Sequence, residues 1–280
     1  MDEKLSLYDK IFKPRLITLS NGKIVMEKRS RKPLVILVLL LATLLSVRIT
    51  GFKFSTIMKR GYQFWDYLFR MFPPELSYVN SIWQPLFDTI KMSILGSLIG
   101  ALAAIPFAML ASSNIIKNKL IVVLTRLFFS ITRTLPTLVT AMVATFVFGL
   151  GTIAGTTSIA IFTFSYVGKL LYEQIETVNM GSFEAMESMG CTKLKAFCVA
   201  IIPQIMPGFI ANSLYCFEGN VRYASILGYV GAGGIGLIIN QTIGWRYYSR
   251  LGMIVVILFF TVVIIEYLSM WIRNKLVGEI

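Results

Sequence analysis

The most constraining feature of this chain is a series of long apolar stretches that recur along almost its whole length. An α-helix needs about 20 mostly apolar residues to cross the hydrocarbon layer of a bilayer. Six stretches approach or exceed that length, at residues 33–50, 86–111, 120–149, 152–172, 204–229 and 251–272. Only 15% of the residues are charged and 56% are hydrophobic, which is far from the balance of a soluble domain. We therefore expect an all-α membrane protein with six transmembrane helices.

The basic residues predict how these helices are oriented. The net charge is +13, but the lysines and arginines gather in the N-terminal part and in loops beside the apolar stretches. They do not form the stripe with interleaved aromatics that would favour a nucleic-acid partner. If residues 1–32 are cytosolic, that side of the membrane holds sixteen basic residues and the other side six. Because cytosolic loops carry the excess of Lys and Arg, we predict a multi-pass cell-membrane protein with both termini in the cytosol.

Two parts are expected, a cytosolic tail of residues 1–32 and a transmembrane domain of residues 33–280. Within the tail, the stretch RLITLSNGKIVMEKR alternates apolar and polar residues around Asn21-Gly22. Asn-Gly favours a two-residue hairpin turn because both positions tolerate positive φ. A small hairpin and a solvated tail without regular structure both stay open as interpretations.

The chain lacks the side chains that most enzyme and metal sites use. It has no histidine, which is the commonest general base and metal ligand. Its three cysteines, Cys191, Cys198 and Cys216, form no C-x-x-C pair, and we interpret them as free thiols. The phosphate-binding sequence G-x-x-x-x-G-K-[ST] is absent as well. We expect no catalytic residue, no metal site and no cofactor bound by this chain.

Charged residues inside the apolar stretches are candidates for a functional site, because each costs at least ~2.5 kcal/mol at the centre of a bilayer. Arg126 and Arg133 lie seven residues apart in the third stretch and share one helical face to within about 20°. Arg126 is near the predicted cytosolic end, where its side chain is able to snorkel. Arg133 is deeper, and it is either a substrate contact in a translocation pathway or a structural arginine.

Glu218 and Arg222 stand at positions i and i+4 of the fifth stretch, where a helix brings opposite charges together. One interpretation is a structural ion pair that makes both charges tolerable in lipid. The other places the pair beside a translocation pathway, where Arg222 meets an anion or Glu218 holds a gate closed. Gly219 and Asn220 weaken a helix, which suits a cavity wall better than a lipid face. Glu266 in the last stretch has no evident partner in the sequence.

The segment NMGSFEAMESMGCTKLKAFCVAIIPQIMPG, between the fourth and fifth stretches, is too polar at its start to cross a membrane. Ser182 is suited to cap a helix that begins near Phe183, and Gly190 is suited to end it. A second short helix is expected from Thr192 toward Pro203. Such a helix–glycine–helix unit on the inner face of the membrane is suited to bind in a groove of another protein.

This segment resembles the EAA loop in the permease subunits of binding-protein-dependent ABC importers. The spacing of that loop holds throughout, with Met in place of the usual third alanine. The positions that match are Glu184, Ala185, Gly190 and Pro203, whereas Met186, Ala200 and Ile202 replace a usual alanine, isoleucine and leucine. In that family the loop forms coupling helices that dock on a cytosolic ATPase. The resemblance therefore implies a cytosolic coupling loop at residues 182–203.

Four further motifs resemble the permease of the phosphonate importer: FPPELSY at 72–78, RTLPTLV at 133–139, GLG at 149–151 and VRYASILGYVGAGGIG at 221–236. The resemblance implies a type I ABC importer fold and a non-catalytic subunit that forms the pathway for phosphonate or a related phosphorus oxyanion. It also implies a second permease chain, identical or paralogous, two cytosolic subunits that hydrolyse ATP, and an extracellular phosphonate-binding protein. An importer of methionine, or of another amino acid or osmolyte, is the alternative, since those permeases share the loop and the glycine-rich segment.

Gly231, Gly233 and Gly236 stand in the spacing G-x-G-x-x-G of dinucleotide-binding turns. Such a turn follows a strand of a βαβ unit and usually has an acidic residue about 20 positions later, and the sequence predicts neither. We expect these glycines, together with Gly234, to form a non-helical turn at the outer end of the pathway, as part of an outer gate. A flexible outer loop is the alternative.

Overall fold

The computed structural model describes residues 15–18, 22, 24–27 and 32–278. Residues 1–14 of the predicted tail lie outside this range. The chain divides into two compact units, residues 1–66 and 67–280. The boundary between them falls within the helix α3, Phe54–Arg70.

A short hairpin forms in the first unit, which confirms one of the two interpretations of the tail. Its strands β1, Arg15–Thr18, and β2, Ile24–Glu27, pair antiparallel. Residues 19–23 connect them, so the connection is longer than the expected two-residue turn. Gly22 has a φ of 76°, while Asn21 lies outside the described residues.

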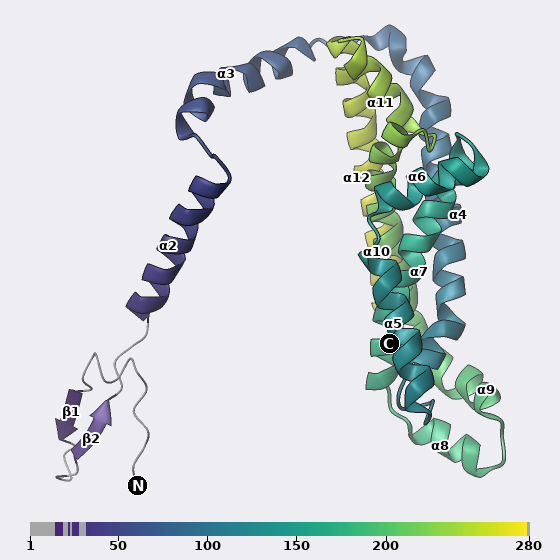
Figure 1. Cartoon of the computed structure of the whole chain (residues 1–280). Coiled ribbons are helices and arrows are strands. Elements are labelled where there is room, and N and C mark those ends of the chain that lie inside the picture. Colours follow the sequence, from purple (N-terminus) through teal and green to yellow (C-terminus); the bar gives the residue numbers. More distant parts are fainter. Residues whose placement is uncertain (1–14, 19–21, 23, 28–31, 279–280) are drawn as a thin grey trace. The chain divides into compact units, whose positions relative to one another are not determined.

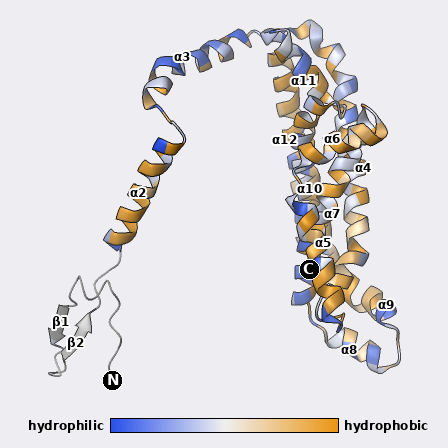
Figure 2. Cartoon of the chain, viewed as in Figure 1, coloured by the Kyte–Doolittle hydropathy of each residue, from blue (hydrophilic) through white to orange (hydrophobic). Residues whose placement is uncertain are grey.

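Two helices follow the hairpin. The helix α2, Lys32–Ile49, is apolar over nearly its whole length (Figure 2) and is long enough to span a membrane, as predicted for the first stretch. The helix α3 occupies a part of the chain where an outer loop was expected. Its sequence gathers apolar and aromatic side chains on one face, a pattern typical of helices that lie in the membrane interface.

The second unit is a helical bundle around α4, Val79–Ala111, and α7, Thr152–Thr177. The helix α10, Ile202–Leu227, packs on both of them. The helix α12, Tyr248–Gly278, packs on α10 and also contacts α4 (Figure 1). These four helices run side by side and supply most of the buried surface of this unit.

Small residues allow α4 and α7 to approach each other closely. Gly96 and Gly100 form a G-x-x-x-G pair on α4, a pattern that lets membrane helices pack backbone against backbone. A β-carbon at Gly96 would lie 2.7 Å from Ile159 Cγ2, and one at Gly100 would lie 2.4 Å from the carbonyl oxygen of Ala160. Because apolar helices in lipid gain little from the hydrophobic effect, this close packing contributes directly to the stability of the pair.

The predicted third span, residues 120–149, is not one continuous helix. It is divided into α5, Lys119–Thr134, and α6, Thr137–Phe148, which are bent relative to each other by 88°. The break follows from Pro136, which has no backbone N–H and disfavours the helical conformation of the residue before it. That residue, Leu135, is extended, with φ −74° and ψ 119°.

By length and hydropathy, four helices of the described residues are able to cross a membrane, or five if α5 and α6 form one bent span. The helix α7, which covers the predicted fourth span, is long but rich in Thr and Ser and does not reach the same hydropathy. The number of six spans and the cytosolic position of both termini therefore stay predictions.

The two ends of the bundle carry different short elements. At one end lie α8, Gly181–Ser188, and α9, Lys193–Ala196 (Figure 1). Toward the other end lie η1, Leu76–Tyr78, η3, Gly228–Val230, and α11, Ile235–Gly244. The predicted coupling segment and the predicted gate glycines thus lie at opposite ends of the bundle.

Candidate functional site

The predicted coupling segment folds into two short helices, but its first cap differs from the expected one. The helix α8 begins at Gly181, whose N–H donates to Asn179 Oδ1 at 2.9 Å. Ser182 lies inside the helix and is exposed, so the prediction that it caps α8 was wrong. The N-cap residue is Met180, whose side chain makes no capping bond, and the amide oxygen of Asn179 before it accepts from the first N–H of the helix.

Gly190 follows the end of α8, as the sequence predicts. Its φ of 84° lies in the left-handed region, which glycine adopts without strain. Gly190 N–H donates to Glu187 O at 3.0 Å, and Cys191 N–H donates to Met186 O at 3.1 Å. These are the two bonds of a Schellman motif, which satisfies the last carbonyls of α8 and redirects the chain toward α9.

The second helix of the segment does not stop before Pro203. The helix α9 continues through a π-helical turn, η2, Phe197–Ile201, directly into α10. Pro203 stands in the first turn of α10, and its ring crowds the carbonyl four residues earlier. We attribute the wider π turn to this crowding. The expected separate helix is therefore an extension of α10.

One face of residues 181–203, which we call the coupling unit, is anchored in a hydrophobic core. Phe183 and Phe197 are buried there against Ile115, Leu171 and Ile175. Ile115 follows α4, and the other two belong to α7, so the unit is fixed to two further parts of the bundle. Burial of a Phe side chain contributes about 1.5–3 kcal/mol.

The opposite face of the coupling unit is exposed. Met189 is 74% exposed and Leu194 is 63% exposed. Of the predicted coupling residues, Met186 packs half-buried against the core, and four are exposed: Glu184, Ala185, Gly190 and Pro203. Exposed apolar side chains beside an acidic residue form a surface suited to contact with another protein.

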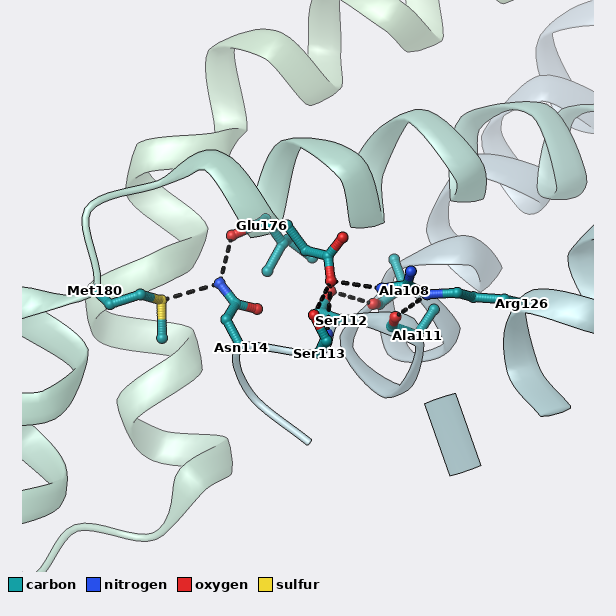
Figure 3. A network of polar contacts seen from close by, with 9 residues as sticks. Ala108, Ala111, Ser112, Ser113, Asn114, Arg126, Glu176 and Met180 are labelled. Carbon is teal, nitrogen blue, oxygen red and sulfur yellow. Dashed lines mark hydrogen bonds and ion pairs between the residues drawn. The ribbon is translucent and has the colours of Figure 1, made fainter. Parts of the chain in front are cut away.

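An ion pair that the sequence did not reveal joins α5 to the end of α7 beside the coupling unit (Figure 3). Glu176 accepts hydrogen bonds from the Arg126 side chain, from Ser113 N–H at 2.8 Å and from the Ser113 hydroxyl. Arg126 Nε also donates to Ala111 O at 2.8 Å, and its guanidinium lies 4.9 Å from the centre of the Tyr172 ring. Arg126 is therefore held by protein groups and does not depend on snorkelling.

The same region connects the turn after α4 to the end of α7, to the residue before α8 and to α9. Asn114 Nδ2 donates to Ile175 O at 2.8 Å and lies 3.1 Å from Met180 Sδ. Lys193 Nζ donates to Ile115 O at 3.2 Å. We call the side chains of Ser113, Asn114, Arg126 and Glu176 the coupling-end cluster. Through it, α4, α5 and α7 are tied to the same end of the bundle as α8.

The Glu218–Arg222 pair forms as predicted, and a third charge joins it. Arg222 Nη2 donates to Glu218 Oε1, and Arg273 Nη2 of α12 lies 3.9 Å from Glu218 Oε2. The Glu218 side chain is 5% exposed, whereas that of Arg222 is 51% exposed. One buried carboxylate thus faces two guanidinium groups. The surplus positive charge is accessible mainly on Arg222.

Arg133 and Glu266 are not part of this group. Arg133 lies exposed in the last turn of α5, where its charge complements the helix dipole. Glu266 lies exposed on α12. Within residues 32–278, no ion pair joins either of them to Glu218 or Arg222.

Asn220 does not interrupt α10, which is continuous through Gly219 and Asn220. Its buried side chain donates to Ser97 Oγ of α4 at 2.8 Å and to Thr163 Oγ1 of α7 at 2.9 Å. A buried amide that is hydrogen-bonded in this way is tolerated in a core. Asn220 therefore fixes the register of α10 against its two neighbours.

The helix α10 separates two cavities of different chemistry. The first, which we call the aromatic–arginine cavity, measures about 410 Å³ and is lined by residues of α7 and α10: Phe162, Tyr166, Tyr215, Cys216, Gly219, Arg222 and Tyr223. The second, the apolar groove, measures about 490 Å³ and lies between α4, α10 and α12. Apart from three serines, its lining is wholly apolar and includes Leu98, Leu214 and Phe217.

The glycine-rich turn between η3 and α11 packs closely against neighbouring backbone. Three of its residues have φ between 71° and 81°: Gly231, Gly233 and Gly234. Gly231 O accepts a hydrogen bond from Gly151 N–H at 2.9 Å, and a β-carbon at Gly236 would lie 2.3 Å from Ser225 O. No strand precedes this turn within residues 32–278, so its surroundings differ from those of a dinucleotide-binding turn.

Comparison with known proteins agrees with this architecture. Residues 96–277 match the family described as "Binding-protein-dependent transport system inner membrane component". The phosphate-import permease protein PhnE of Mycolicibacterium smegmatis is 34% identical over 74% of this chain, which spans only 39% of that protein. The phosphite transport system permease protein PtxC of Stutzerimonas stutzeri is 28% identical over 72% of this chain and 74% of its own. A chain of the inward-facing MetNI methionine ABC transporter superposes with a TM-score of 0.64 at 19% identity, covering 72% of this chain and 99% of that one.

Proposed function

Since the chain belongs to the family of binding-protein-dependent transport system inner membrane components, as a multi-pass permease of the cell membrane with the type I ABC importer fold, we propose that it imports a phosphorus oxyanion: phosphonate, phosphite or phosphate. One observation carries the substrate class. Relatives whose names concern phosphate and phosphite align over nearly three quarters of the chain. The likeness to the methionine transporter, at 19% identity, concerns the fold alone.

The charges of the membrane part support an anionic substrate. An anion that crosses a low-dielectric helix bundle needs positive charge to replace its hydration. Arg222 offers such a charge, because Glu218 balances only one of the two guanidinium groups that face it. Arg133 is a second exposed cation of the predicted spans, and its contact with substrate stays a prediction.

A separate cytosolic ATPase drives the transport in this proposal. The chain has no G-x-x-x-x-G-K-[ST] sequence with which to hold nucleotide phosphates itself. The exposed face of the coupling unit, with Glu184 and Ala185, offers a docking surface, and its buried face transmits movement to α7 and α10. A second permease chain, which is either a copy or a paralogue, completes the pathway. An extracellular binding protein delivers the substrate.

The glycine turn is proposed as the outer gate of the pathway. Its tight packing on the chain around Gly151 supports a rigid element, since missing β-carbons allow the backbones to touch. The residues assigned to this gate are Gly231, Gly233, Gly234 and Gly236.

Growth on defined phosphorus sources tests the substrate class. We expect deletion of the gene to abolish growth on methylphosphonate or phosphite as sole phosphorus source, and a restored copy to recover it. Uptake of labelled methionine by the same strains is the control for the alternative importer. Growth that is unchanged by the deletion, together with methionine uptake that depends on the gene, would contradict the proposal.

Substrate-stimulated ATP hydrolysis by the purified complex tests the coupling unit. A β-branched side chain at the left-handed position costs about 1–2 kcal/mol, so Gly190→Val distorts the turn, whereas Gly190→Asn keeps it because Asn tolerates this conformation. We expect Gly190→Val and Glu184→Ala to reduce the stimulated rate by roughly an order of magnitude, while Gly190→Asn stays near the original. Normal stimulation in the first two variants, with normal membrane insertion, refutes the coupling role.

A further inference from the structure

We propose that the aromatic–arginine cavity between α7 and α10 binds a tetrahedral phosphorus oxyanion inside the translocation pathway. This inference rests on the proposed function, because a cationic site within the membrane serves a transporter of anions. It goes beyond that function by assigning the substrate contact to one cavity and to named donors, Arg222 with the hydroxyl groups of Tyr166, Tyr215 and Tyr223.

The donors that line the cavity are available for a ligand. Within the described part of the chain, the hydroxyl groups of Tyr166, Tyr215 and Tyr223 make no hydrogen bond, and Arg222 uses its guanidinium only toward Glu218. A guanidinium has several N–H groups in a planar fork, which matches two oxygens of a phosphoryl group. A phosphonate has three oxygens that accept hydrogen bonds. The lining thus offers a guanidinium and three hydroxyl groups that are able to donate hydrogen bonds to these oxygens.

The carboxylate behind the cavity positions Arg222 without cancelling its charge. Glu218 is buried and does not line the cavity. Glu218 Oε1 accepts a hydrogen bond from Arg222, and Arg273 Nη2 lies 3.9 Å from Glu218 Oε2. With two cations around one anion, the local charge is positive. A bound oxyanion would meet this surplus on the exposed side of Arg222.

The cavity is not suited to face lipid. A guanidinium that is 51% exposed in the interior of a membrane helix is costly unless water, protein or a counter-charge meets it. The apolar groove lies along another face of the same helix, and its residue Phe217 lies only about 3 Å from Gly219 along the helix axis. At equal depth, α10 therefore has one apolar face and one face with charged and hydroxyl groups.

Gly219 leaves space in the cavity wall. A β-carbon there would meet only Tyr223 Cε2, at 3.8 Å, whereas one at Gly96 or Gly100 would overlap the neighbouring helix. The absence of a side chain at Gly219 therefore does not serve helix packing. At about 410 Å³, the cavity has the size of a small-ligand pocket, which holds phosphate or a short phosphonate with accompanying water.

Thiol labelling tests whether the cavity is accessible to anions. The purified permease–ATPase complex in lipid nanodiscs carries Gly219→Cys or, as matched control at the same depth, Phe217→Cys. Cys191 and Cys198 are replaced by serine, and Cys216, which lines the same cavity, is replaced by alanine. We expect the anionic reagent sulfonatoethyl methanethiosulfonate to label Gly219→Cys, and methylphosphonate to slow that labelling at least threefold. Phe217→Cys should react only with an uncharged, lipid-soluble maleimide. Equal labelling of both positions by the anionic reagent, or labelling of Gly219→Cys that methylphosphonate leaves unchanged, overturns the proposal.

Substitutions of the donors then assign their roles. In the Gly219→Cys background, we expect Arg222→Gln to raise the methylphosphonate concentration needed for half-protection by roughly tenfold or more, the loss typical of a hydrogen bond to a charged group. Tyr223→Phe, which keeps the ring, should raise it by about threefold. Elution volume and thermal unfolding report whether each variant is folded. Unchanged protection in a folded Arg222→Gln variant overturns the assignment.

The outcomes separate this inference from the proposed function. If the unmodified transporter takes up no phosphorus oxyanion, the proposed function fails. If it takes up methylphosphonate while Arg222→Gln and Gly219→Leu variants transport it with unchanged kinetics, the function stands and the cavity is not the binding site. An Ile210→Phe variant, which fills the apolar groove, serves as control and should transport normally.

Discussion

Two arginine–carboxylate pairs of this permease contain the same chemical groups but differ in how many other partners those groups have. In the coupling-end cluster, Glu176 accepts three hydrogen bonds, and Arg126 has a carbonyl and an aromatic ring as further partners. In the C-terminal part of α10, Arg222 has Glu218 as its one partner and is half exposed. A fully partnered pair ties helices together, whereas a pair with spare donors and surplus charge is free to bind a ligand. This difference distinguishes the coupling-end cluster from the cavity in which we propose that the substrate binds.

The largest effect is expected from a substitution that removes the carboxylate of the coupling-end cluster. Glu176→Ala leaves Ser113 N–H and the Arg126 guanidinium without their acceptor, and we expect it to lower the free energy of unfolding by about 1–3 kcal/mol. Thermal unfolding in detergent measures this change. Glu176→Gln is the control, because it keeps an acceptor oxygen of the same shape and should lose less. A Glu176→Ala variant that unfolds like the original protein would show that the cluster is not a structural tie.

A double-mutant cycle compares the two pairs directly. We expect the coupling energy between Arg126→Met and Glu176→Met to be in the range of about 0.5–3 kcal/mol for contacting residues. For Arg222→Met and Glu218→Met the coupling should be smaller, since half of Arg222 is exposed and Arg273 partly replaces it. Chemical denaturation of all six variants gives both values. A larger coupling energy for the Arg222 pair than for the Arg126 pair would show that the Arg222 pair contributes more to stability, contrary to this prediction.

Removal of the negative charge behind the cavity should make the cavity bind an anion more tightly. Glu218→Gln leaves two guanidinium groups uncompensated, and at a distance of several ångströms one charge changes the energy of a bound anion by about 1 kcal/mol. We expect methylphosphonate to protect Gly219→Cys from labelling at a concentration roughly fivefold lower. Protection that becomes weaker in a folded Glu218→Gln variant would instead show that Glu218 is needed to hold Arg222 in its binding position.

The sequence predicted the features that depend on near neighbours. Glu218 and Arg222 meet because they are one helical turn apart, and Gly190 ends α8 because its left-handed conformation is local. The family follows from the spacing of the coupling segment, which also depends only on positions along the chain. The pair Arg126–Glu176 was missed, since 50 residues separate its members. Their predicted positions near the same end of neighbouring spans were the signal that could have revealed it.

Other errors came from reading hydropathy without backbone geometry. Residues 120–149 are apolar enough on average to predict one span, yet Pro136 breaks them into two helices bent by 88°. The predicted coupling loop, residues 182–203, was expected to hold two separate helices, but the π turn before Pro203 joins the second one to α10. The sequence indicated a cavity wall at Gly219, but it could not predict the other residues of the aromatic–arginine cavity, because these come from both α7 and α10 and depend on how the two helices pack.

The smallest expected effect comes from a third arginine–carboxylate pair, which is exposed and lies outside both sites. Arg250 Nε donates to Glu75 Oε2 at 3.0 Å, and the Ser77 hydroxyl donates to Glu75 Oε1 at 3.0 Å. The hydrogen bond from Arg250 and, to a smaller extent, that from Ser77 hold the pKa of Glu75 below its ordinary value of 4.5. A carboxyl group whose pKa is lowered by folding stabilises the protein fully above its ordinary pKa, and this contribution is lost as the pH falls through the lowered value. The difference in melting temperature between the original protein and Glu75→Gln should therefore be constant above about pH 5.5 and shrink below about pH 4.5. Scanning fluorimetry over this range measures it, and a difference that grows on acidification would show that Glu75 is not stabilised as a carboxylate.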